Sequence, residues 1–178
     1  MGRARQDADR ALDPWRLDAD GSLVGTAGSL GLLIVSDARV GPAFEVEGRM
    51  ELVSSTNGFF QGGVAFGRPS WDGQDWMSFR IKRNSDEGKV AYFSHHLYRP
   101  ESGPFPIEVP DRNAFRVRVQ AGKVSAWVND APVQEGYQPA KGLVTTPDVR
   151  VGFGGYVDEN LVSLRFRDVR LRRLAASR

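Results

Sequence analysis

The chain has 178 residues, of which 40% are hydrophobic and 26% charged, as in ordinary globular proteins with a buried core. Its net charge of +2 is too small a bias to indicate nucleic acid or an anionic membrane surface as a partner. It contains no cysteine, which excludes disulfides, thiolate nucleophiles and thiolate metal sites. No apolar run approaches the length that membrane insertion requires.

The N-terminal segment 1–13 is polar and has no apolar stretch of the kind that signal peptides carry. The sequence predicts a disordered or loosely attached tail over 1–13 and a single β-sandwich domain over 14–175. We expect an extracellular or periplasmic domain of a larger exported protein, and a cytoplasmic location stays open.

The first half of the domain predicts four extended segments. Residues 15–25 form two short pieces around an Asp-Gly turn, and residues 28–36 form a buried strand. The segment 43–54 alternates most clearly, because its side chains form two separate rows. The apolar row is Phe44, Val46, Met50 and Leu52, and the polar row is Glu45, Glu47, Arg49 and Glu51. The glycine-rich segment 59–67 follows, and its small residues would let a ligand approach the backbone.

A hairpin lies at the centre of the sequence, with strands at 75–83 and 89–98 around the turn 84–88. Apolar residues, among them Met77, Phe79 and Phe93, occupy one face of this hairpin because side chains alternate along a strand. The opposite face is the predicted working surface, and it carries Trp76, Ser78, Arg80, Lys82, Tyr92, Ser94, His96 and Tyr98.

The second half predicts a long surface loop over 99–111, because four prolines make a central strand untenable there. Strands resume at 113–120 and 123–128, and a turn at Asn129 and Asp130 leads into a short return strand. After a second loop come the strands 149–156 and 161–174, the last with a bulge near Asp168.

No segment shows helical periodicity over three turns. About a dozen short strands, separated by turn residues at intervals of roughly 8–12 residues, are typical of sandwiches. Strands with one apolar and one polar face suit antiparallel pairing. The predicted fold is therefore all-β: a two-sheet antiparallel β-sandwich of the jelly-roll type.

In the order of its elements the sequence resembles the concanavalin A-like lectin and glucanase sandwiches, above all the laminin G-like jelly rolls and the bacterial 3-keto-disaccharide hydrolase type domain. The resemblance extends from Trp15 to Leu174. The segments that carry it are WRLDADGSLVG, FEVEGRMEL, NGFFQGGVAFG, GKVSAWVNDAPV, VRVGFGG and FRDVRLRRL.

The resemblance implies two curved sheets, of which the concave one holds any carbohydrate site. On this expectation the polar hairpin face belongs to the concave sheet, with Gln61 and the row from Glu45 to Glu51 beside it. Sugar rings stack on aromatic side chains and exchange hydrogen bonds with polar ones. The predicted ligand-binding residues are Gln61, Trp71, Trp76, Arg80, Lys82, Tyr92, His96 and Tyr98. Trp127 and Phe153 are instead expected in the core.

Glycoside hydrolysis requires two carboxyl groups that flank the scissile bond. Laminarinase-like members of the resembled superfamily carry Glu-x-Asp-x-x-Glu, whereas this chain has Glu45, Glu47 and Glu51 without the aspartate. These glutamates, with His96 as acid or base, are the catalytic candidates. The structural alternative is that they pair with cationic side chains on neighbouring strands.

Metal and cofactor sites are not expected. His95 and His96 are adjacent on a predicted strand, so they face opposite ways and cannot share one ion. The resemblance leaves a structural calcium open, through Asp148, Asp158 or Asn160. Arginines of the last strand are expected on its solvated face, with an anion patch as the alternative: Arg165, Arg167, Arg170, Arg172 and Arg173.

The sequence thus predicts a carbohydrate-binding or adhesive module whose partner is a glycan or a small carbohydrate. Two alternatives stay open. One is a glycoside-cleaving enzyme of the 3-keto-disaccharide hydrolase or glucanase type, and the other is a protein-interaction domain without sugar binding.

Overall fold

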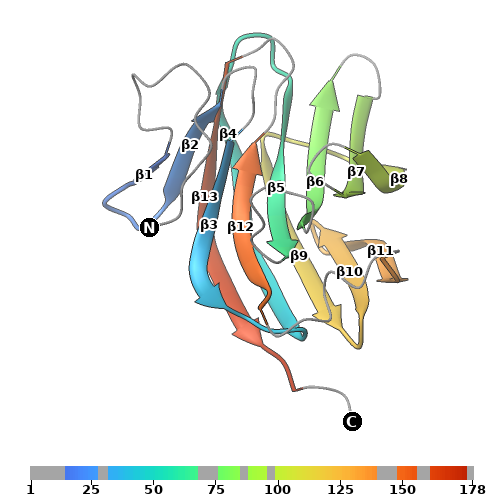
Figure 1. The fold of residues 1–178 in the computed structure, drawn as a ribbon. Coiled ribbons are helices and arrows are strands. Elements are labelled where there is room, and N and C mark those ends of the chain that lie inside the picture. The colour runs from blue at the N-terminus through green and yellow to red at the C-terminus, as the bar shows by residue number, and fades with distance from the viewer. Residues whose placement is uncertain are drawn as a thin grey trace.

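The structure is a computed structural model that describes residues 15–27, 32–67, 76–84, 88–95, 99–139, 148–155 and 161–175. In this part of the chain the regular elements are thirteen β-strands, arranged in two antiparallel sheets that face each other (Figure 1). The seven-stranded sheet contains, in order, β1 (Trp15–Leu17), β2 (Leu23–Ala27), β13 (Val162–Arg173), β4 (Phe44–Ser55), β9 (Arg112–Gln120), β10 (Lys123–Val128) and β11 (Ala131–Tyr137). The six-stranded sheet contains β3 (Leu32–Arg39), β12 (Arg150–Gly155), β5 (Phe60–Gly67), β6 (Trp76–Asn84), β7 (Gly88–His95) and β8 (Arg99–Pro106). The predicted jelly-roll β-sandwich is confirmed.

The core lies between the sheets and is built by alternation. On β4, Phe44, Val46 and Met50 are completely buried, as their spacing predicts. Phe44 meets Phe66 of the opposite sheet with ring centroids 5.8 Å apart, and such contacts lock the two layers together. Phe153 packs against the same core, as expected from the sequence.

The central hairpin is confirmed. Strands β6 and β7 pair in a register that places Phe79 opposite Phe93 and Arg80 opposite Tyr92. The predicted bulge in β13 is confirmed as well, because the pairing with β4 shifts between Arg167 and Arg170. Asp168, inside this bulge, has a positive φ of 53°.

The proline-rich segment 99–111 is a loop only over 107–111, so the prediction was wrong for 99–106. Residues 99–106 form β8, which pairs with β7 at the edge of the six-stranded sheet. An edge strand needs backbone donors on one side only, so prolines are tolerated where the missing N–H would face away from the neighbour.

Among the described residues, no helix is long and apolar enough to cross a membrane.

Trp15 covers one end of the core, and its position depends on a glycine. A Cβ added at Gly25 would lie 2.5 Å from Cζ3 of the Trp15 ring. We expect Gly25→Val to displace the indole, to lower the free energy of unfolding by about 1–3 kcal/mol and to shift tryptophan emission to longer wavelength. Urea unfolding followed by fluorescence measures both effects. Leu17→Ala is the control, because Leu17 on the same strand is 74% exposed; equal losses in the two variants would contradict the prediction.

Candidate functional site

The outer face of the six-stranded sheet, which points away from the core, carries the predicted ligand-binding residues that the structure describes. The β-ladders align them across three strands: Gln61 pairs with Lys82, and Arg80 lies between Gly63 and Tyr92. Trp76 is opposite Gly67 at the end of the same face. The alternation of β5, β6 and β7 therefore gathers Gln61, Trp76, Arg80, Lys82 and Tyr92, as predicted.

These side chains are much less exposed than an ordinary solvated face. Trp76 is 4% exposed, and Gln61, Arg80 and Tyr92 are 7% exposed each. Nε of Arg80 donates a hydrogen bond to Oγ of Ser78 at 2.9 Å, and Ser78 is itself buried. A guanidinium that is held this way has few alternative rotamers. Polar groups of this face are thus already ordered before any ligand arrives.

Small residues fill the middle of this face. The outward positions of β5 after Gln61 are Gly63, Ala65 and Gly67, and their partners on β12 are Gly154, Gly152 and Arg150. These four glycines and one alanine give the floor no large side chains of its own, and the β5 positions are buried, with Ala65 at 2% exposure. The aromatic and cationic side chains of β6 and β7 stand directly beside this floor.

Several predicted residues lie outside the described part of the chain: Trp71, His96, Tyr98, Asp158 and Asn160. Asp148 is described, and its carboxylate pairs with Nε of Arg39 at 2.9 Å. Among the described residues no group of His, Asp and Glu side chains is arranged to hold a metal ion.

The glutamate row of β4 does not lie beside this face, so the predicted adjacency was wrong. β4 belongs to the seven-stranded sheet, between β13 and β9, and its outward row is on the opposite surface of the sandwich. Glu45, Glu47 and Glu51 face arginines on both neighbouring strands: Arg172 and Arg118, Arg170 and Arg116, Arg165 and Arg112. Three of the C-terminal arginines, Arg165, Arg170 and Arg172, therefore form part of a cross-strand ladder of opposite charges.

Glu45 is the most buried member of this ladder. Its side chain is 1% exposed, and Arg118 donates to its Oε2 at 2.6 Å while Arg172 donates to its Oε1. Burial alone would raise the pKa of Glu45, but the two arginine hydrogen bonds outweigh it and hold the pKa below its usual value. Glu45 stays ionised at neutral pH, which suits a structural ion pair and not a proton donor. The catalytic role of Glu47, Glu51 and His96 stays a prediction.

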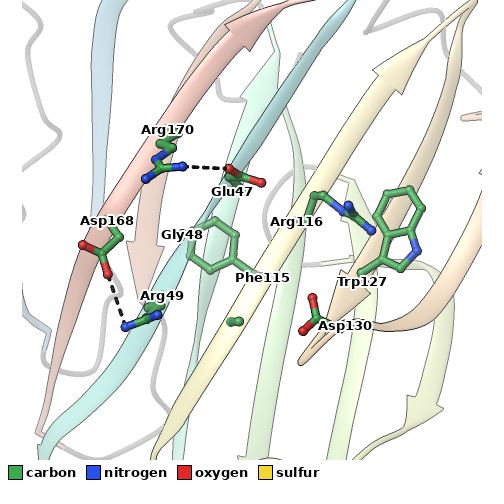
Figure 2. Close-up of a pocket in the computed structure, with 10 residues that line it drawn as sticks. Glu47, Gly48, Arg49, Phe115, Arg116, Trp127, Asp130, Asp168 and Arg170 are labelled. Atoms are coloured by element: carbon green, nitrogen blue, oxygen red, sulfur yellow. Dashed lines mark ion pairs between the residues drawn. The ribbon is translucent and has the colours of Figure 1, made fainter.

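A groove of about 420 Å³ crosses the outer face of the seven-stranded sheet, and the sequence did not reveal it (Figure 2). Trp127 stands at one side of it, so its expected place in the core was wrong. Val124, Ala126 and Val128 of the same strand are buried, and alternation turns Trp127 outward, where it is half-buried. The alternation of apolar and other residues along 123–128 was the sequence signal that predicts an outward Trp127.

The groove exists because short residues lie between long ones. Ala114 occupies an outward position of β9 between Arg112 and Arg116, and its partner on β4 is Arg49. Gly48, the residue before Arg49, pairs with Phe115 and lies opposite the β13 bulge. The complete lining is Glu47, Gly48, Arg49, Ala114, Phe115, Arg116, Trp127, Asp130, Asp168 and Arg170. Figure 2 shows the Arg49–Asp168 and Glu47–Arg170 pairs on one side and Trp127 with Asp130 on the other.

No protein-family model matches the chain, and no curated protein matches its sequence. Solved structures do match it. A functionally unknown protein from Saccharomyces cerevisiae has a TM-score of 0.64 at 14% identity, with 92% of this chain and 94% of that chain covered. The carbohydrate binding module CBM66 from Bacillus subtilis has a TM-score of 0.53 at 14% identity, with coverages of 89% and 90%. Alginate lyase AlyC3 has a TM-score of 0.57 at 8% identity, with coverages of 90% and 78%.

At these identities the likeness shows the fold alone. The chain is a two-sheet β-sandwich jelly roll of the kind that these proteins share, and its function has to be argued from its own two outer faces.

Proposed function

We propose that this β-sandwich is a carbohydrate-binding module that holds a glycan against the outer face of the six-stranded sheet. The observation that carries the proposal is the ordered row of Trp76, Arg80 and Tyr92 beside a floor of glycine and alanine. A sugar ring needs a flat apolar surface for its C–H face and fixed hydrogen-bonding groups for its hydroxyls. Indole, phenol, guanidinium and the Gln61 amide provide both kinds of contact.

Binding is favoured over glycoside cleavage by the composition of this face. The four central strands β12, β5, β6 and β7 contain no aspartate or glutamate, and the outer strands β3 and β8 contain one carboxylate residue each, Asp37 and Glu101. A two-carboxyl mechanism at this face would need both groups from outside these strands. Recognition of a sugar needs no carboxyl pair, so the residues present are sufficient for it.

The fold supports the same reading. CBM66 is a carbohydrate binding module by name, and its likeness to this chain covers nearly the whole of both. This likeness supports the proposals that the chain is a concanavalin A-like sandwich and that it is extracellular or periplasmic. A protein-interaction domain is the second candidate, and it would show no sugar binding at all.

The test is a glycan array followed by calorimetry on the wild-type chain and on Arg80→Lys and Trp76→Phe. Arg80→Lys keeps the charge but loses the planar fork, so we expect roughly tenfold weaker binding. Because Arg80 is buried and bonded to Ser78, circular dichroism and urea unfolding of the variant check that it is folded. Lys89→Ala is the matched control, because Lys89 is exposed on the same hairpin and pairs with Glu108 at 3.2 Å.

The titrations are run with calcium and with a chelator, and equal affinities are expected because no metal is proposed at this face. Unchanged binding in both site variants would overturn the proposed face. If the folded wild-type chain binds no glycan of the array, the carbohydrate function is overturned and the protein-interaction domain is favoured.

A further inference from the structure

We propose that the groove around Trp127 is a second, independent saccharide site, which takes a neutral sugar unit and makes the module bind glycans on two opposite surfaces. This inference uses the carbohydrate class of the proposed function but not its site. The groove lies on the seven-stranded sheet, on the far side of the core from Arg80.

The size of the groove indicates a small ligand. Its volume of about 420 Å³ falls in the range of small-molecule sites, which is roughly 300–1,000 Å³. A stable protein partner would instead need roughly 800 Å² of complementary surface on each side. The groove therefore suits a small saccharide better than a protein surface.

The charges of the lining select against ionic ligands. Three arginines, Arg49, Arg116 and Arg170, are balanced by three carboxylates, Glu47, Asp130 and Asp168. A cation or an anion would therefore meet as much repulsion as attraction in the groove. A neutral polyol gains from both signs, because each hydroxyl donates to a carboxylate and accepts from a guanidinium.

Arg116 is arranged as a donor to such a ligand. Among the described residues it forms no ion pair, and its Cζ lies over the Trp127 ring at 4.2 Å from the centroid. This contact fixes the guanidinium and reduces the entropy that would be lost when it binds a hydroxyl.

Two ion pairs line the side of the groove opposite Trp127, and breaking them costs little free energy. Nη1 of Arg49 lies 3.4 Å from Asp168 and Nη1 of Arg170 lies 4.0 Å from Glu47. All four side chains are more than about two-fifths exposed, and pairs of this kind contribute little to stability. Sugar hydroxyls can replace these contacts without leaving a buried charge unpaired.

The experiment titrates the full chain with a panel of neutral di- to tetrasaccharides of glucose, galactose, mannose and fructose, and with uronate-containing oligosaccharides. Two variants address the groove. Trp127→Ala removes the aromatic support of Arg116, and Ala114→Leu fills the floor from an outward position without touching the core. We expect each to weaken binding of a neutral saccharide at least about tenfold, with unchanged circular dichroism. Arg80→Lys is the control on the opposite face and should leave this binding intact.

A neutral saccharide that loses affinity in both groove variants but not in Arg80→Lys supports the second site. If only Arg80→Lys loses saccharide affinity, the groove is not a saccharide site, and the function proposed for the six-stranded sheet is unaffected. Preference of the groove for uronates over neutral sugars would overturn the ligand class, and failure of every sugar with the folded wild-type chain would overturn both sites together.

Discussion

Replacing both Arg118 and Arg172 by alanine is expected to lower the free energy of unfolding at pH 7 by roughly 3–5 kcal/mol. The two guanidiniums are partly in solvent, at 40% and 63% exposure, whereas the Glu45 side chain between them is 1% exposed. Without its partners this carboxylate would be a buried, unpaired charge. Urea unfolding followed by circular dichroism measures the loss.

The pH dependence should change sign in this variant. In the wild-type chain the folded pKa of Glu45 is below its usual value of 4.5, so its stabilisation is complete above that pH. It is lost as the pH falls through the folded pKa. In the double variant burial acts alone and raises the pKa, so stability should increase as the pH falls from 7 toward the pKa of the buried acid.

Arg112→Ala with Arg170→Ala is the matched control. It also removes two arginines that face the glutamates of β4, but these side chains are 84% and 82% exposed and their ion pairs are longer. We expect it to cost about 1 kcal/mol or less. Adding Glu45→Gln to the Arg118 and Arg172 double variant should restore part of the lost stability at pH 7. Equal losses in the two arginine pairs would contradict a special role for Glu45.

Alternation explains which parts of the fold could be read from the sequence. The apolar rows of β4 and β9 are buried against the core, and a shift by one residue would expose these side chains to water. Their faces are therefore fixed locally, and the bulge at Asp168 follows because the apolar period breaks there. The same alternation along β10 buries Val124, Ala126 and Val128 and turns Trp127 outward.

The assignment of strands to sheets could not be read in this way. β4 and β5 follow each other along the chain but lie in different sheets, and β4 pairs with β13 from the far end of the domain. Alternation shows which row is buried but not which neighbour lies beside it. The candidate residues of β5, β6 and β7 lie on neighbouring strands because hairpin connections keep consecutive strands adjacent. The groove also depends on the pairing of β4 with β13 and with β9, which are far from β4 in the sequence, and no local pattern specifies those pairings.

Gly63→Ala is expected to destabilise the sandwich by about 3 kcal/mol or more, which exceeds the usual cost of an added methyl group. A Cβ at this position would lie 2.1 Å from the carbonyl oxygen of Phe79 on the neighbouring strand. Backbone cannot turn aside as a flexible side chain does, so β5 and β6 would have to separate where they carry the proposed site.

Gly58→Ala separates this clash from backbone strain. Gly58 has a φ of +77° but nothing within 4 Å of an added Cβ, so its replacement should cost only about 1–2 kcal/mol. Denaturant midpoints for the two variants give the comparison, and the reverse order would show that strand β5 tolerates a side chain at position 63. Gly63 lies beside Arg80, so the close contact that excludes a Cβ also keeps a side chain out of this position of the face. The same backbone packing that stabilises the sheet thus shapes the surface proposed for the glycan.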